Sequence, residues 1–146
     1  MFKHILVPTD GSELAQKAIK AAVAFAKAVG ARITGYYAMH EPAFIYNRFG
    51  NLDQQIKTEL ERRAREVAQR YLDEIGKVAR AAGVEFEPLI TISDIPAEGI
   101  VDAAQERKCD VIFLASHGRS GMSRLILGSV TQDVLARSTL PVIVFR

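Results

Sequence analysis

Residues 116–135 read SHGRSGMSRLILGSVTQDVL and directly follow the apolar run 111–115, VIFLA. The apolar run predicts a buried strand, and the segment that begins near Ser129 predicts a helix. Glycines in the intervening loop let backbone N–H groups approach an anion closely. The first turn of the helix adds unpaired N–H donors and the positive end of a dipole, and Arg119 and Arg124 add two cations. The stretch therefore predicts an anion-binding loop for a nucleotide.

Two common nucleotide-binding signatures are absent. The loop does not read Gly-x-x-x-x-Gly-Lys-Ser/Thr, and no Gly-x-Gly-x-x-Gly follows a predicted strand. The loop instead resembles the signature of the universal stress protein family, Gly-x2-Gly-x9-Gly-Ser/Thr. Gly118, Gly128 and Ser129 stand at the expected spacing, and Ala115 replaces the first glycine. The opening HILVPTDGS and the closing LPVIVFR also resemble the two ends of that family, so the resemblance covers nearly all of the chain.

Composition narrows the class of protein. The chain has 146 residues, of which 49% are hydrophobic and 25% charged, which predicts a single domain over 1–146 with a real core. A net charge of +2 is too small to indicate nucleic acid or a membrane surface as a partner. No signal peptide and no membrane-spanning apolar stretch stand out. The single cysteine, Cys109, cannot form an internal disulfide and reads as a small core residue, so we expect a cytoplasmic protein.

Predicted strands and helices alternate along the chain. Strands are expected at 3–9, 31–39, 84–92, 109–115 and 140–145, and helices at 13–29, 53–82, from about 96, and 129–138. Alternation of this kind predicts an α/β domain with a mostly parallel sheet. The loop from His40 to Leu52 contains several aromatic residues, and three roles stay open for it: a cover over a ligand, a partner surface, or a loop folded back on the core.

The resemblance implies an open, mostly parallel five-stranded sheet of order 3-2-1-4-5 with helices on both faces, a Rossmann-like fold of the adenine nucleotide alpha hydrolase-like kind. Ligands of such sheets bind where the strand order reverses, here between the first and fourth strands. The resemblance also implies that Asp10 contacts the adenosine and that the backbone N–H and C=O of Ala38 contact the edge of the adenine ring. The expected nucleotide-binding residues are Pro8, Thr9, Asp10, Ala38, Ala115, Ser116, His117, Gly118, Arg119, Ser120, Gly121, Gly128, Ser129, Val130 and Thr131.

Several of these residues also have a purely structural interpretation. Asp10, Gly11 and Ser12 make a good turn and helix cap. Ser129 and Gln132 read as a capping box, which is compatible with anion binding by the backbone of Ser129. His117 either contacts a phosphate or fills the turn. The methyl group of Ala115 either crowds a ligand or narrows the allowed backbone angles.

The function that the resemblance implies is an ATP-binding or adenine-nucleotide-binding regulatory module of the stress response, with Mg²⁺ or Mn²⁺ held through the phosphates. Two alternatives are a family member that does not bind ATP and acts through protein contacts, and a slow nucleotide hydrolase. No convincing catalytic set is found, and His4 and His40 are too scattered for a metal site. The apolar strand 140–145 predicts a homodimer, an unknown protein partner is also expected, and nucleic acid and membrane are not.

Overall fold

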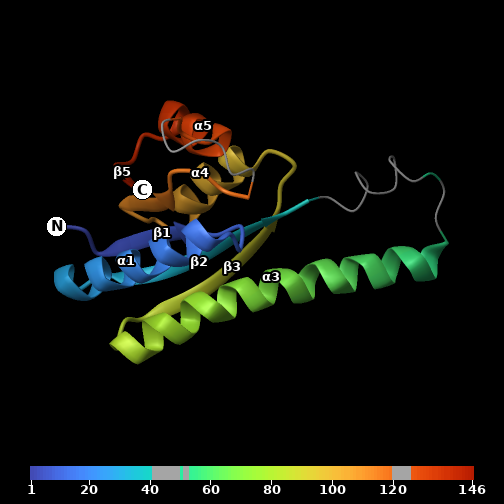
Figure 1. Cartoon of the computed structure of the whole chain (residues 1–146), viewed down its shortest axis with the longest axis horizontal. Coiled ribbons are helices and arrows are strands. Elements are labelled where there is room, and N and C mark those ends of the chain that lie inside the picture. The colour runs from blue at the N-terminus through green and yellow to red at the C-terminus, as the bar shows by residue number, and fades with distance from the viewer. Residues whose placement is uncertain (41–49, 51–52, 120–125) are drawn as a thin grey trace.

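The computed structural model describes residues 1–40, 50, 53–119 and 126–146. Its centre is a sheet of five parallel strands in the order β3-β2-β1-β4-β5 (Figure 1). The strands are β1 (His4–Pro8), β2 (Arg32–Met39), β3 (Phe86–Ile92), β4 (Val111–Ala115) and β5 (Val142–Phe145). The predicted fold class and strand order are confirmed, with strand limits that differ from the predicted ones by one or two residues at most ends.

Helices cover both faces of the sheet. Alternate strand residues point to opposite faces, and on one face Ile5 and Val7 of β1 pack with α1 (Glu13–Val29) and α3 (Gln54–Ala82). On the other face Leu6 packs with α4 (Pro96–Glu106) and α5 (Ser129–Arg137). The predicted central position of β4 explains why its side chains are apolar on both faces.

The helix ends are set by local chemistry. Ser12 caps α1 as predicted, because its side-chain oxygen accepts the N–H of Ala15 at 3.2 Å. Gly30 and Gly83 end α1 and α3 in the left-handed conformation, with φ of 66° and 72°. Each cap fixes the direction in which the chain enters or leaves the sheet, and the Ser12 cap does so directly beside the carboxyl end of β1.

A buried polar cluster lies at the opposite, amino end of the sheet. His4 is 4% exposed, and its Nε2 lies 2.7 Å from the hydroxyl of Thr34, which donates to Glu87 at 2.7 Å. The Nδ1 atom of His4 has no hydrogen-bond partner among the described residues. Burial lowers the pKa of His4, and Arg32 lowers it further, against the opposing effects of Glu87 and Asp110. His4 is therefore a neutral core residue in the folded chain near neutral pH.

Replacement of His4 by glutamine should flatten the acid dependence of stability. The pKa of His4 is lowered in the folded chain, so below about pH 6.5 the unfolded chain binds a proton at His4 more readily than the folded chain does. The free energy of unfolding of the wild type should then fall as the pH falls through this window. Urea unfolding at about pH 7.5 and about pH 5 should show a smaller loss for His4→Gln than for the wild type. Equal losses in the two proteins would contradict this assignment.

Candidate functional site

A cavity of about 370 Å³ opens at the carboxyl end of the sheet, where β1 and β4 lie side by side. The chain runs from β1 outward to β2 and β3 and then crosses to β4 and β5, so the strand order reverses at this point. The predicted residues that line the cavity come from the ends of β1, β2 and β4 and the start of α5: Pro8, Thr9, Asp10, Ala38, Ala115, His117, Gly118, Arg119, Gly128, Ser129, Val130 and Thr131.

The two predicted ligand-binding segments therefore meet around one cavity of a size that suits a small ligand. The other three predicted residues have different positions. Ser116 is buried beside the cavity and lines a neighbouring hollow. Ser120 and Gly121 lie outside the described residues, as do Arg124 and the aromatic part of the loop after His40.

The carboxylate of Asp10 joins the two segments. One oxygen accepts the N–H of Ser12 at 2.9 Å, which fixes the turn into α1. The other accepts the N–H of Arg119 at 3.0 Å, which holds the glycine loop over the end of β1. A side chain at Gly118 would place its Cβ 2.2 Å from this second oxygen, so the position requires glycine for lack of space. Asp10 thus has the structural role that the turn pattern predicts, and it also borders the cavity.

The first turn of α5 presents free backbone donors to the cavity. Gly128 is the residue before the helix and has no side chain to cap it. The N–H groups of Ser129, Val130 and Thr131 are the first three of the helix and have no acceptor within it. The predicted capping box is wrong, because Ser129 is the first helical residue rather than the cap, and the side chain of Gln132 donates to the carbonyl of Leu127 at 2.6 Å. The donors that a cap would have satisfied remain available to an anion.

Backbone groups at the end of β2 also face the cavity. The N–H of Thr9 donates to the carbonyl of Tyr36 at 3.0 Å, whereas the carbonyl of Met39 accepts from Ser93 on the β3 side. Alternate residues of a strand direct their N–H and C=O groups to the same side. Ala38 follows Tyr36 by two residues, so its N–H and C=O point into the space beyond the end of β1. This geometry does not depend on the side chain at this position.

Ala115 occupies a regular position at the end of β4. Its methyl group lies on the same side of the sheet as Val111 and Phe113 and packs against the core under α1. Its carbonyl accepts the hydroxyl of Thr131 at 2.9 Å, which ties α5 to β4. The strand backbone here is ordinary, since among the described non-glycine residues only Lys108 has a positive φ. The methyl group therefore packs against the core, although Ala115 also borders the cavity.

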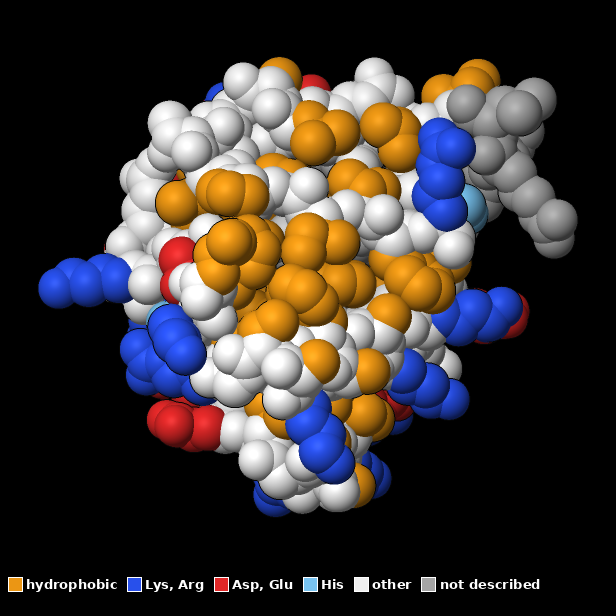
Figure 2. Space-filling model, turned by 90° about the vertical axis from the view of Figure 1, so that its left-hand side faces the viewer, with side chains coloured by type: hydrophobic (Ala, Val, Ile, Leu, Met, Phe, Trp, Pro, Cys, Tyr) orange, Lys and Arg blue, Asp and Glu red, His pale blue; other side chains and the backbone are white. Residues whose placement is uncertain are grey.

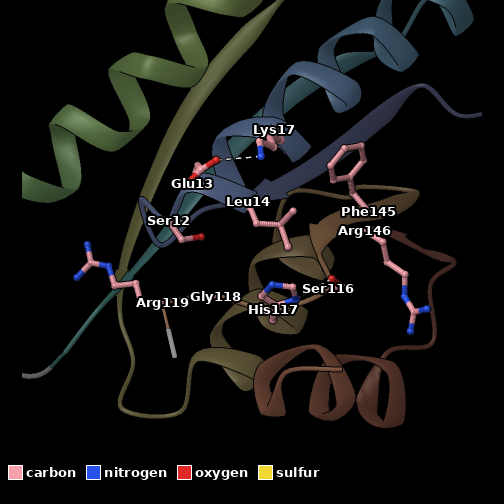
Figure 3. Close-up of a pocket in the computed structure, with 10 residues that line it drawn as sticks. All are labelled: Ser12, Glu13, Leu14, Lys17, Ser116, His117, Gly118, Arg119, Phe145 and Arg146. Atoms are coloured by element: carbon pink, nitrogen blue, oxygen red, sulfur yellow. Dashed lines mark hydrogen bonds and ion pairs between the residues drawn. The ribbon is translucent and has the colours of Figure 1, made fainter. Parts of the chain in front are cut away.

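A second hollow of about 790 Å³ lies beside the glycine loop (Figure 3). Residues 116–119 separate it from the first cavity, and the first turn of α1 forms its far side. Lys17 in its wall is paired with Glu13 at 2.9 Å, and the Nδ1 of His117 lies 3.0 Å from the hydroxyl of Ser116. His117 thus has a partner within its own turn, as one of its two predicted interpretations requires.

The comparisons with known proteins agree with the geometry. The sequence profile of the Universal stress protein family matches residues 1–146. The chain belongs to the universal stress protein family. The Thermus aquaticus "Universal stress protein in QAH/OAS sulfhydrylase 3'region" is 34% identical over the full length of both proteins. The solved structure of MJ0577, a universal stress protein of Methanocaldococcus jannaschii, has a TM-score of 0.82 and 30% identity, and the match covers 99% of this chain and 95% of that one.

A further universal stress protein has been solved in complex with cAMP. Its TM-score is 0.70 at 24% identity, over 99% of this chain and 97% of that one, and the likeness shows a shared fold. Within the residues described for the present universal stress protein, no helix is both long and apolar enough to span a bilayer. In the same residues, no three His, Cys, Asp or Glu side chains are grouped to hold a metal ion.

Some cavity residues of this universal stress protein were not predicted. They are mostly apolar or aromatic: Ala15, Tyr36, Tyr37, His40, Pro96, Ile100 and Leu114. His40, which directly follows β2, and Pro96, which follows β3, were accessible to the rule that residues just after a parallel strand gather at one edge of the sheet. The others carry no chemical signature, because an apolar wall residue looks like any core residue. The predicted buried state of Cys109 is confirmed, and burial raises the pKa of its thiol to about 12.

Ala115→Gly should destabilise the protein. The substitution removes a methyl group that packs against the core and adds backbone freedom at the end of a central strand. The expected loss is about 1 kcal/mol in the free energy of unfolding, measured by urea denaturation. An unchanged or increased stability would show that the alanine at this place in the family signature is not held by core packing.

Proposed function

We propose that this universal stress protein binds ATP or a related adenine nucleotide in the cavity between β1 and β4, as a regulatory module of the stress response. The observation that carries the proposal is the direction of the free backbone groups. The uncapped first turn of α5 at one end and the N–H and C=O of Ala38 at the other face the same cavity. Anion donors and an adenine-reading edge in one cavity suit a nucleotide better than any other common small ligand.

The two ends of the cavity suit different parts of the nucleotide. The backbone of Ala38 offers one donor and one acceptor in the pattern that the edge of an adenine ring needs. Asp10 keeps unused lone pairs on both carboxylate oxygens, which suit a ribose hydroxyl or an adenine amino group. The N–H groups of Ser129, Val130 and Thr131 suit the phosphates. Mg²⁺ or Mn²⁺ would enter with the nucleotide, held through phosphate oxygens.

The alternatives are less well supported. Ala115 favours a member that does not bind ATP only if its methyl group crowds the ligand, and that methyl group packs against the core under α1. The case for a hydrolase rested on His117 as a base, and its Nδ1 faces the Ser116 hydroxyl rather than a carboxylate that would orient and polarise the ring. The universal stress protein with bound cAMP supports the proposal by showing that this fold holds an adenine nucleotide in that protein.

Titration calorimetry with ATP, in the presence of Mg²⁺, tests the proposal. The wild type should bind one ATP per chain, and Gly118→Val should weaken binding at least tenfold, because the new side chain displaces Asp10 or the loop. Ala136→Val is the matched control, since it adds a branched side chain at an exposed position of α5. The control should bind as the wild type does. Absence of saturable ATP binding in the folded wild type would contradict the proposal.

We also propose that two copies associate through the β5 edge. β5 is the last strand of the sheet, and all four of its residues are apolar and half-buried. Figure 2 shows hydrophobic side chains gathered across the side of the molecule where β5 and the C-terminus lie. An unpaired apolar edge of this kind is a surface on which a second strand can pair. A two-fold axis at this edge would let identical chains cover it.

Val144→Lys should convert the dimer into monomers. The lysine places a charge within the apolar edge, and burial of that charge against a second copy is unfavourable. Ile92→Lys is the matched control, since Ile92 is 50% exposed on β3 at the opposite edge of the sheet. Light scattering should report a monomer for Val144→Lys and a dimer for the wild type and the control. A dimer that survives Val144→Lys rules out this interface.

A further inference from the structure

The side chain of Arg119 reaches from the glycine loop to α3. Its Nη2 donates to the hydroxyl of Tyr71, and its guanidinium carbon lies 5.4 Å from the centre of the Tyr71 ring. The ring face and the hydroxyl thus both contribute to holding the cation. Figure 3 shows the Arg119 side chain extending away from His117. This contact joins residues 48 positions apart and is a direct side-chain link between the loop and α3.

Tyr71 is itself held in place by the ends of two strands. Its ring packs on Gly11, where an added Cβ would lie 2.2 Å from ring atoms. It also lies against Tyr37 of β2, with ring centres 5.7 Å apart and a tilt of 42°. Tyr37 lines the cavity, whereas Tyr71 does not. Tyr71 therefore lies next to the residues that line the cavity, and it binds the guanidinium of Arg119, which is one of them.

The charge of Arg119 has neutral side-chain partners in this arrangement. Tyr71 offers a phenol hydroxyl and a ring face, and the ion pairs between described residues do not include Arg119. Asp10 is engaged by the backbone N–H of Arg119. Arg119 lines the same cavity as Gly128 and Ser129, which begin α5. A phosphate attracts a guanidinium much more strongly than a neutral phenol does, because both groups are charged and can form paired hydrogen bonds.

We propose that Arg119 is a phosphate-dependent link between the nucleotide cavity and α3. A phosphate group in the cavity draws the guanidinium off Tyr71 and so releases the contact between the glycine loop and α3. This inference rests on the proposed nucleotide site and adds a means by which occupancy is transmitted. α3 is suited to receive it, because its buried residues all lie between Ala68 and Ala79, and its first half extends past the sheet (Figure 1).

Competition of this kind has a thermodynamic consequence. The Tyr71 contact stabilises the arrangement without phosphate, so its removal should strengthen the binding of every ligand that recruits Arg119. Ligands without phosphate should not respond. The sign distinguishes the proposal from a role in which Tyr71 merely positions Arg119 for the ligand, because loss of a positioning residue would weaken binding.

Calorimetric titrations of adenosine, AMP and ATP test the link. Tyr71→Phe keeps the ring and removes the hydroxyl, and it should tighten ATP binding about threefold to tenfold and leave adenosine unchanged. Arg119→Met should weaken the binding of ATP and leave the affinity for adenosine unchanged. Arg70 is an exposed arginine beside Tyr71, so Arg70→Met is the matched control. When Arg119→Met is already present, adding Tyr71→Phe should no longer change the affinity for ATP. This double-mutant cycle isolates the coupling between Arg119 and Tyr71.

Three outcomes overturn the proposal. Weaker ATP binding by Tyr71→Phe would make Tyr71 a positioning residue. Equal changes for ATP and adenosine, or no change, would show that the contact does not compete with phosphate. A folded wild type that binds neither nucleotide nor adenosine would contradict the proposed function as well, whereas the first two outcomes leave nucleotide binding intact.

Discussion

The site depends on two hydrogen bonds that the carboxylate of Asp10 accepts. The carboxylate accepts one N–H from the turn into α1 and one from the glycine loop, so a single side chain fixes two segments more than 100 residues apart. Both segments follow strands that the sheet places side by side. The close approach of the loop to this carboxylate in turn requires glycine at position 118. Parallel pairing of β1 and β4, the Asp10 bridge and the glycine are thus three parts of one constraint.

The site is defined largely by backbone groups that the fold leaves without partners. β1 pairs with β2 only as far as Tyr36, whose carbonyl accepts the N–H of Thr9. The backbone N–H and C=O of Ala38 therefore have no β1 partner. α5 begins at a glycine cap and leaves its first N–H groups open. Side chains around these groups are chiefly tethers: Thr131 ties α5 to β4, and Asp10 ties the loop to β1. The proposed nucleotide binding uses these groups as fixed donors and acceptors.

Sequence patterns predicted the α/β class and the glycine loop, because both depend on local order, whereas the strand order and the places of Asp10 and Ala38 came from the family resemblance. An apolar run, a glycine loop and a helix start define where a strand ends, and ends of parallel strands must gather at one edge of the sheet. What failed depends on register or on contacts distant in sequence. The N-cap of α5 is Gly128 rather than the predicted Ser129, so the first turn of the helix has no side-chain cap. The direction of the Ala115 methyl group and the contact of Arg119 with Tyr71 need three-dimensional packing that no local pattern contains.

The most direct measurement is an amide NMR titration of the isotopically labelled protein with ATP. Saturable chemical-shift changes are expected only around the cavity, at the N–H groups of Asp10, Ala38, Gly118 and the first turn of α5. Amides at the opposite end of the sheet, such as those of His4 and Glu87, should stay unchanged. Saturable shifts centred elsewhere, or none at millimolar ATP, would contradict the claim that the free backbone groups between β1 and β4 form a nucleotide site.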